Sequence, residues 1–238
     1  MNAMFKKGLL ASVLTVTASS VMAASSIDIQ VKGKIVPSSC TPVFTSGGGI
    51  ADFGTIKVSS LNSTTTTSLP DVKTIPITIN CEEATRIGVT FNDAHADSAP
   101  TEDLPQAFTD TDFAIDPENT SGLGMYNGKK IGAYSMGIKM DAGTLTNDKG
   151  ERLYPIYSRN IDSETMWGKR GGPHYFQIVT DKSETYSFTS TSSGNQPVAQ
   201  KQVNFNVGIM AMINPTDDLH ITDEATLDGL TNVELVYL

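Results

Sequence analysis

The sequence predicts an all-β protein built as an antiparallel sandwich with Greek-key connections. Alternating apolar and polar segments recur along the chain, and turn-forming residues separate them. Thr, Val and Ile are frequent, and 20 glycines and 11 prolines supply turns and chain breaks. No segment has the apolar period of a helix longer than two turns, and we expect one short helical turn at residues 223–227.

The first 23 residues are interpreted as a secretory signal peptide that is cleaved after Ala23. Lys6 and Lys7 form a basic start, and residues 9–16 form a short apolar core. No run of apolar residues approaches the roughly 18 that a membrane-spanning helix needs. We therefore expect an exported protein that does not span a membrane.

The charge of the chain limits its partners. It has 17 basic and 26 acidic residues, with a formal net charge of −9, and loss of Lys6 and Lys7 makes the mature chain more acidic. An acidic surface argues against binding to nucleic acid or to an anionic membrane.

Residues 27–35 form an alternating segment near the start of the mature chain. Every second position is apolar or glycine: Ile27, Ile29, Val31, Gly33 and Ile35. This period is typical of a half-buried strand with one apolar face. No turn signal folds the segment back on a neighbour, so it needs a groove supplied by a later part of this chain or by another chain. Glycine on the apolar face indicates a shallow point in that groove.

Cys40 and Cys81 are the two cysteines of the chain. In an oxidising compartment a disulfide is the expected state of such a pair. The bond would close a loop of about 42 residues, worth roughly 4 kcal/mol in the chain-entropy model. The alternative, a metal or nucleophile site, lacks the nearby histidines that zinc spacing requires. Cys81 ends an alternating segment on its apolar face.

The remaining strand candidates are alternating segments bounded by turn residues. In order they are residues 50–58, 72–81, 86–92, 130–140, 153–161, 175–179, 186–191, 202–213 and 231–238. Residues 93–123 lack this period and are rich in Asp, Glu, Pro and Thr, which indicates an acidic insertion. We expect an N-terminal arm at residues 24–36 and one sandwich domain at residues 37–238.

The last strand candidates have apolar faces that a complete sandwich would cover. These faces carry Val203, Phe205, Val207 and Ile209 on one segment and Val233, Leu235 and Tyr237 on the other. A sandwich whose final strand stops at the chain terminus can lack an edge partner for it, which leaves an open groove. The arm of a neighbouring copy has suitable residues to fill such a groove.

Several segments together resemble the subunits of chaperone–usher pili. They are the alternating arm, Cys40 shortly after it, residues 52–56, the Ile77–Cys81 strand and the penultimate Tyr237. Within that group the chain is most similar to the GltF-like periplasmic family, through residues 40–43, 47–50, 128–133 and the Tyr237-Leu238 ending.

This resemblance implies an incomplete immunoglobulin-like sandwich and a role in a cell-adhesion fimbrium. A periplasmic chaperone would lend a strand to the groove, and the arm of the next subunit would replace it at an outer-membrane usher. It implies donor-arm roles for residues 27–35, and groove and chaperone contacts for Val233, Leu235 and Tyr237. A receptor on a host or other surface is a further expected partner. The chain departs from the family at Ala225, where glycine is common, and in the long segments 93–123 and 141–173.

Other functions remain open from the sequence. A closed sandwich that holds its own arm would be a monomeric binding module, and Tyr154, Tyr157, Trp167 and Tyr175 could then form a glycan-binding surface rather than core. We expect no enzyme, cofactor or metal. Residues 133–137 resemble a nucleophile elbow, but a strand continues through them. His95, His174 and His220 are far apart in sequence, and Asp110, Asp112 and Asp116 lack the pattern of a calcium loop.

Overall fold

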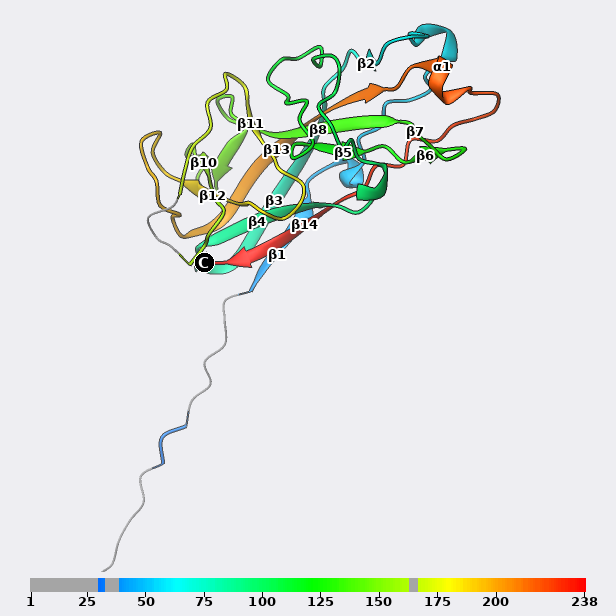
Figure 1. Cartoon of the computed structure of the whole chain (residues 1–238). Coiled ribbons are helices and arrows are strands. Elements are labelled where there is room, and N and C mark those ends of the chain that lie inside the picture. Colours follow the sequence, from blue (N-terminus) through cyan, green and yellow to red (C-terminus); the bar gives the residue numbers. More distant parts are fainter. Residues whose placement is uncertain (1–29, 33–38, 163–166) are drawn as a thin grey trace, which may run out of the picture. The chain divides into compact units, whose positions relative to one another are not determined.

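The computed structural model describes residues 30–32, 39–162 and 167–238 (Figure 1). The compact unit treated below comprises Pro37–Leu238. The expected signal peptide, with cleavage after Ala23, lies outside the described residues. So do Ile27, Ile29, Gly33 and Ile35 of the expected arm, whereas Val31 is described and its side chain is 92% exposed.

The first of two antiparallel sheets has the strand order β1-β3-β13-β8-β11; β2 and β9 pair in addition with β13, and β5 pairs with β8. The strands are β1 (Cys40–Phe44), β2 (Thr67–Ser68), β3 (Lys73–Thr85), β5 (Thr120–Gly122), β8 (Gly132–Lys139), β9 (Leu145–Asn147), β11 (Tyr175–Gln177) and β13 (Gln200–Ile213). The central strand β13 is the longest, which agrees with the long alternation predicted for residues 202–213.

The second sheet has the order β10-β12-β4-β14. Its strands are β4 (Ile87–Asp93), β10 (Tyr154–Ser158), β12 (Thr185–Thr189) and β14 (Thr231–Tyr237). A small hairpin joins β6 (Met125–Tyr126) to β7 (Lys129–Lys130) through Asn127-Gly128. The helical content is slight: 3-10 turns at Gly47–Gly49, Val58–Ser60 and Ala96–Ser98, and helix α1 (Thr216–Leu219).

The inward faces of both sheets meet in one hydrophobic core. Phe205 of β13 packs against Phe188 of β12 with 5.5 Å between ring centroids, and Phe176 of β11 meets Tyr186 of β12 at 6.1 Å. Val203 and Val207 are buried in the same core. This packing confirms the predicted antiparallel all-β sandwich. Within the described residues, no helix is long and apolar enough to cross a membrane.

A disulfide joins Cys40 and Cys81, as the sequence predicted. The two residues are direct cross-strand partners in the β1–β3 pair. The bond therefore fixes the start of β1 to the middle of β3, at the margin of the first sheet.

The acidic insertion covers the outer face of the first sheet. Leu104, Phe108 and Phe113 are buried there in a second cluster, with Ala133, Tyr175, Met210 and Met212 from the sheet. The acidic residues of the segment shape its turns: Asp110 accepts a hydrogen bond from Asp112 N–H, and Asp116 accepts two from Asn119. The insertion thus adds a third layer with its own apolar contacts.

Two local predictions are wrong. Residues 50–58 were expected to form a strand, but this segment has no hydrogen-bonded neighbour among the described strands and therefore forms none. Residues 223–227 were expected to be helical and are not; the short helix α1 begins after Pro215 instead. Proline suits a helix start, and Asp217 and Asp218 lie in the first turn, where the helix dipole favours acidic groups.

A buried carboxylate ties the loop before β12 to the second sheet. The Glu184 side chain has no exposed surface and accepts hydrogen bonds from Arg159 Nε at 3.0 Å and from Arg170. The Tyr186 hydroxyl donates to the same carboxylate at 2.6 Å. Burial raises the pKa of Tyr186, so its hydroxyl remains a donor.

We expect Glu184→Ala to lower the free energy of unfolding by about 3 kcal/mol, because it removes the buried carboxylate that two guanidinium groups and a buried hydroxyl share. Urea unfolding of the purified protein measures the change. The control is Glu118→Ala, which removes an exposed partner of Arg159 and should cost less than about 1 kcal/mol. Equal losses for both variants would contradict this assignment.

Candidate functional site: an open groove at the sheet margin

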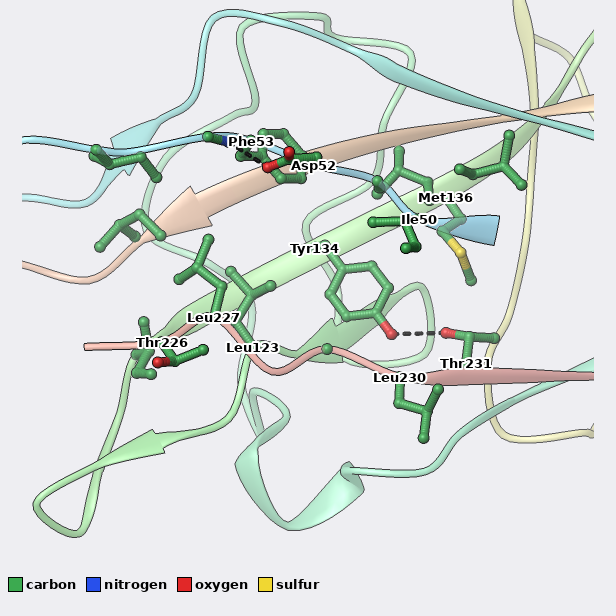
Figure 2. A pocket seen from close by; sticks show the side chains of 18 of the residues that line it. Ile50, Asp52, Phe53, Leu123, Tyr134, Met136, Thr226, Leu227, Leu230 and Thr231 are labelled. Carbon is green, nitrogen blue, oxygen red and sulfur yellow. Dashed lines mark hydrogen bonds between the residues drawn. The ribbon is translucent and has the colours of Figure 1, made fainter. Parts of the chain in front are cut away.

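A groove of about 900 Å³ lies between two extended segments of the sandwich (Figure 2). One wall is residues 50–56, which follow β1. The other wall is residues 221–233, which lead into β14. The floor is apolar and comes mainly from β8, β13 and the residues around β5: Leu123, Ile131, Tyr134, Met136, Val207, Ile209 and Ile213.

Tyr134 lies between the two walls. Its hydroxyl forms a hydrogen bond of 2.7 Å with the Thr231 hydroxyl, which connects the floor to the start of β14 (Figure 2). Burial raises the pKa of Tyr134 to about 12, so the phenol stays neutral. Gly229 lies directly on the Tyr134 ring, where an added Cβ would come within 2.7 Å of it. The wall therefore depends on glycine for this close approach.

Residues that face the core are incompletely covered at the groove. Ile209 points to the same side of β13 as the fully buried Val207 but is only partly buried. Phe53, Ile56 and Val233 are likewise half-buried, and Ile50 at the rim is 72% exposed. A sandwich core normally excludes water from such side chains. The groove is therefore a part of the core that lacks its cover.

The main chain of the first wall is largely unpaired. Within residues 51–56, Gly54 N–H donates to the Asp52 carboxylate at 2.7 Å, and no other backbone hydrogen bond involves these residues in the described part of the chain. Ala51, Phe53 and Ile56 are partly buried, while Asp52, Gly54 and Thr55 are exposed. The segment thus has the inward apolar side chains of an edge strand and lacks the partner of one.

The second wall presents a free strand edge. Leu238 N–H donates to Arg86 and Ala94 N–H donates to Leu230, at the two ends of the β14–β4 pair. In an antiparallel pair, alternate residues exchange hydrogen bonds with the partner. Even-numbered residues of β14 therefore face β4. The main-chain groups of Val233, Leu235 and Tyr237 point away from β4, and Val233 lines the groove.

One end of the groove is closed. Cys40 N–H donates to the Tyr237 hydroxyl at 2.9 Å, so the start of β1 meets the end of β14. Both walls extend from this end along the groove, with opposite chain directions. Ile50, Asp52 and Phe53 lie across the groove from Thr226, Leu227 and Leu230 (Figure 2). The groove therefore has a closed end on the side of Tyr237, where Phe44 and Val233 line it, and an open end near Asp223.

The structure brings together only some of the predicted groove residues. Val207, Ile209 and Val233 line the groove. Leu235 is half-buried beside it, and Tyr237 is half-exposed at its closed end. Val203 and Phe205 are buried deeper, because Phe205 packs on Phe188 between the sheets. The sequence did not indicate Tyr134 or Leu227, whereas the alternation in residues 50–58 was a usable signal for the first wall.

The other candidate sites are dispersed. Residues 133–137 lie within strand β8, so the strand–turn–helix setting of a nucleophile elbow is absent there. His95 contacts Asp228 and His174 contacts Asp141, on different elements. Trp167 and Tyr175 are buried, and Tyr154 and Tyr157 are half-buried. No three His, Cys, Asp or Glu side chains form a metal-binding group within the described residues.

Comparison with known proteins finds a family model that matches part of the chain, and relatives in Escherichia coli that match most of its length. A family model described as a protein of unknown function (DUF1120) matches residues 29–135. The chain is 29% identical to Protein GltF of Escherichia coli (strain K12), over an alignment of 253 positions that covers 98% of this chain and 99% of GltF. It is 24% identical to the Uncharacterized protein YhcF of the same organism, and this alignment covers 93% of the chain and 94% of YhcF.

His95 supports the second wall from outside the groove. Its ring Nδ1 lies 2.5 Å from the Asp228 carbonyl oxygen, and Asp228 N–H in turn donates to Leu123 at 2.9 Å. The hydrogen bond to the Asp228 backbone is the largest cause of a raised pKa for His95. For His174, the largest cause of the raised pKa is the Asp141 side chain, 3.0 Å away.

We expect Asp228→Asn to leave most of the raised pKa of His95 in place, because the backbone carbonyl remains. Asp141→Asn should return the pKa of His174 close to its usual 6.5, because its main partner loses its charge. NMR titration of the ring protons measures both. A histidine with a higher pKa in the folded than in the unfolded protein contributes its full stabilisation below about pH 6.5. This stabilisation is lost as the pH rises through the pKa of the folded state. A full return of the His95 pKa in Asp228→Asn would contradict this assignment.

Proposed function

We propose that the protein is a structural subunit of a fimbrium, assembled by donor-strand complementation. Residues 27–35 of one copy would occupy the groove of the next and complete its sandwich. A periplasmic chaperone would fill the groove before assembly, and an outer-membrane usher would be the place of exchange. The protein would pass through the periplasm and reach the cell surface in the assembled fimbrium.

The observation that carries the proposal is that the groove lacks a strand rather than a ligand. As far as the structure describes the chain, both walls have main-chain groups without a hydrogen-bond partner along the groove, and the floor has core residues that are only partly covered. An exposed apolar strand edge favours association with another chain. Main-chain pairing together with alternate side-chain pockets is the recognition mode of strand addition.

The arm has the alternating pattern of a strand that buries one face. Nine residues of strand span about 30 Å, and every second residue faces the same side. Burying Ile27, Ile29, Val31 and Ile35 would contribute about 1.5–3 kcal/mol each, before the cost of ordering the arm. The signal sequence and the Cys40–Cys81 disulfide support export to an oxidising compartment.

A monomeric binding module is the second candidate. A volume of about 900 Å³ lies within the usual range of small-molecule sites, roughly 300–1,000 Å³. Tyr134 and Thr231 supply polar atoms at the floor. The unpaired strand edge favours the first proposal, because a small ligand would leave its main-chain groups unpaired.

We expect Ile29→Asn to reduce assembly of the exported protein at least tenfold, because it places a polar amide on the buried face of the arm. The matched control is Gln30→Asn, which introduces the same residue on the exposed face and should assemble normally. Size-exclusion chromatography with light scattering measures the assembled fraction. Equal assembly of the two variants would contradict the proposal, and a wild-type protein that remains monomeric without a chaperone would favour the binding module.

A further inference from the structure

The open end of the groove is acidic. Asp223 and Glu224 of the second wall line the groove at this end, and Asp52 lines it part-way along the first wall; all three are exposed, and no Lys, Arg or His lines the groove. None of the three carboxylates forms an ion pair with a residue in the described part of the chain. Lys73 contacts the Phe53 ring and pairs with Asp71. The groove thus has uncompensated negative charge around an apolar floor.

These carboxylates lie where they would meet the outward face of an inserted strand. Asp52 is exposed between the inward-facing Ala51 and Phe53. Asp223 and Glu224 precede the half-buried Ala225 on the opposite wall. An inserted strand would direct its polar side chains to the same solvent side, where cross-strand neighbours interact.

The arm has a matching asymmetry of charge. Its polar positions are Asp28, Gln30, Lys32 and Lys34, so both lysines are in its second half. The apolar positions alternate almost symmetrically and therefore distinguish poorly between the two directions of insertion. The lysines do distinguish the two directions, because only one direction brings Lys32 and Lys34 to the acidic end of the groove.

The direction of insertion also distinguishes the arm of the same chain from the arm of another copy. Cys40 is held at the closed end by Tyr237 and by the disulfide to Cys81. The arm of the same chain ends only a few residues before Cys40, so it could enter its own groove only with Lys34 near the closed end. The arm of another copy is free of this constraint and can enter antiparallel to β14, with Lys34 beside Glu224.

We propose that the acidic end of the groove recognises Lys32 and Lys34 in the arm of a second copy of this chain, and so fixes the direction of the inserted strand. This inference rests on the proposed function. It adds that the groove selects strands with basic residues on their outward face, and that it rejects the chain's own arm. Exposed ion pairs change affinity by up to about fivefold each, and salt screens them.

The test is a charge exchange in the full-length exported chain. Lys32→Glu with Lys34→Glu places an acidic arm against the acidic groove, and Asp223→Lys with Glu224→Lys places the basic arm against a basic groove. We expect each double variant alone to assemble at least tenfold less than the wild type at low salt. A mixture of the two should recover assembly, because each arm then meets a groove of opposite charge. The control, Lys129→Glu with Lys149→Glu, makes the same charge change at exposed sites outside the groove and should assemble normally.

Size-exclusion chromatography with light scattering, at about 20 mM and about 500 mM salt, gives the readout. Recovery in the mixture, with the difference from wild type reduced at high salt, supports the inference. Normal assembly of both double variants overturns it, while loss of assembly in Ile29→Asn would still support strand insertion. No recovery in the mixture also overturns it, because the losses would then reflect damage to each chain. If Ile29→Asn assembles normally as well, both proposals fail.

Discussion

The structure depends on one incomplete margin of the sandwich, the groove between residues 50–56 and 221–233. There the core that lies between the two sheets has no strand to cover it. Backbone groups and apolar side chains that are withdrawn from water need partners, and most of the sandwich supplies them. Along the groove, the main chain of residues 51–56, apart from Gly54 N–H, and the outer edge of β14 have no hydrogen-bond partners within the described chain. The Cys40–Tyr237 hydrogen bond closes one end, so the uncovered part is a groove with a defined start.

The rest of the molecule keeps this open sandwich together. The disulfide fixes β1 to β3 at the closed end, and Tyr134 links the floor to Thr231 at the start of β14. On the far side of the first sheet, the acidic insertion buries Phe108 and Phe113 against Met210 and Met212. These contacts stabilise the strands that form the floor without filling the groove, which leaves the floor available to another chain.

Sequence alternation predicted the elements whose partners lie in the same chain. The segments that became β3, β4, β13 and β14 were identified because one face of each packs on the core. Residues 50–58 were also expected to form a strand, with a break at Gly54. A strand needs a hydrogen-bonded neighbour as well as a suitable sequence, and the apolar pattern does not show whether that neighbour is present. Strand β8 is buried on both faces, so its sequence did not show that Tyr134 faces the groove. The contacts of Leu104 and Phe113 were missed because the insertion has no period.

The direction of strand pairing connects the geometry of the groove with the choice between monomer and polymer. An arm that folds back from Cys40 must run parallel to β14, and parallel pairing is slightly less stable per residue than antiparallel pairing. It would also place its lysines at the end away from Asp223 and Glu224. An arm from another copy can pair antiparallel to β14 and meet those carboxylates. Backbone pairing and charge therefore favour the same intermolecular arrangement, and neither depends on the hydrophobic pattern that fills the groove.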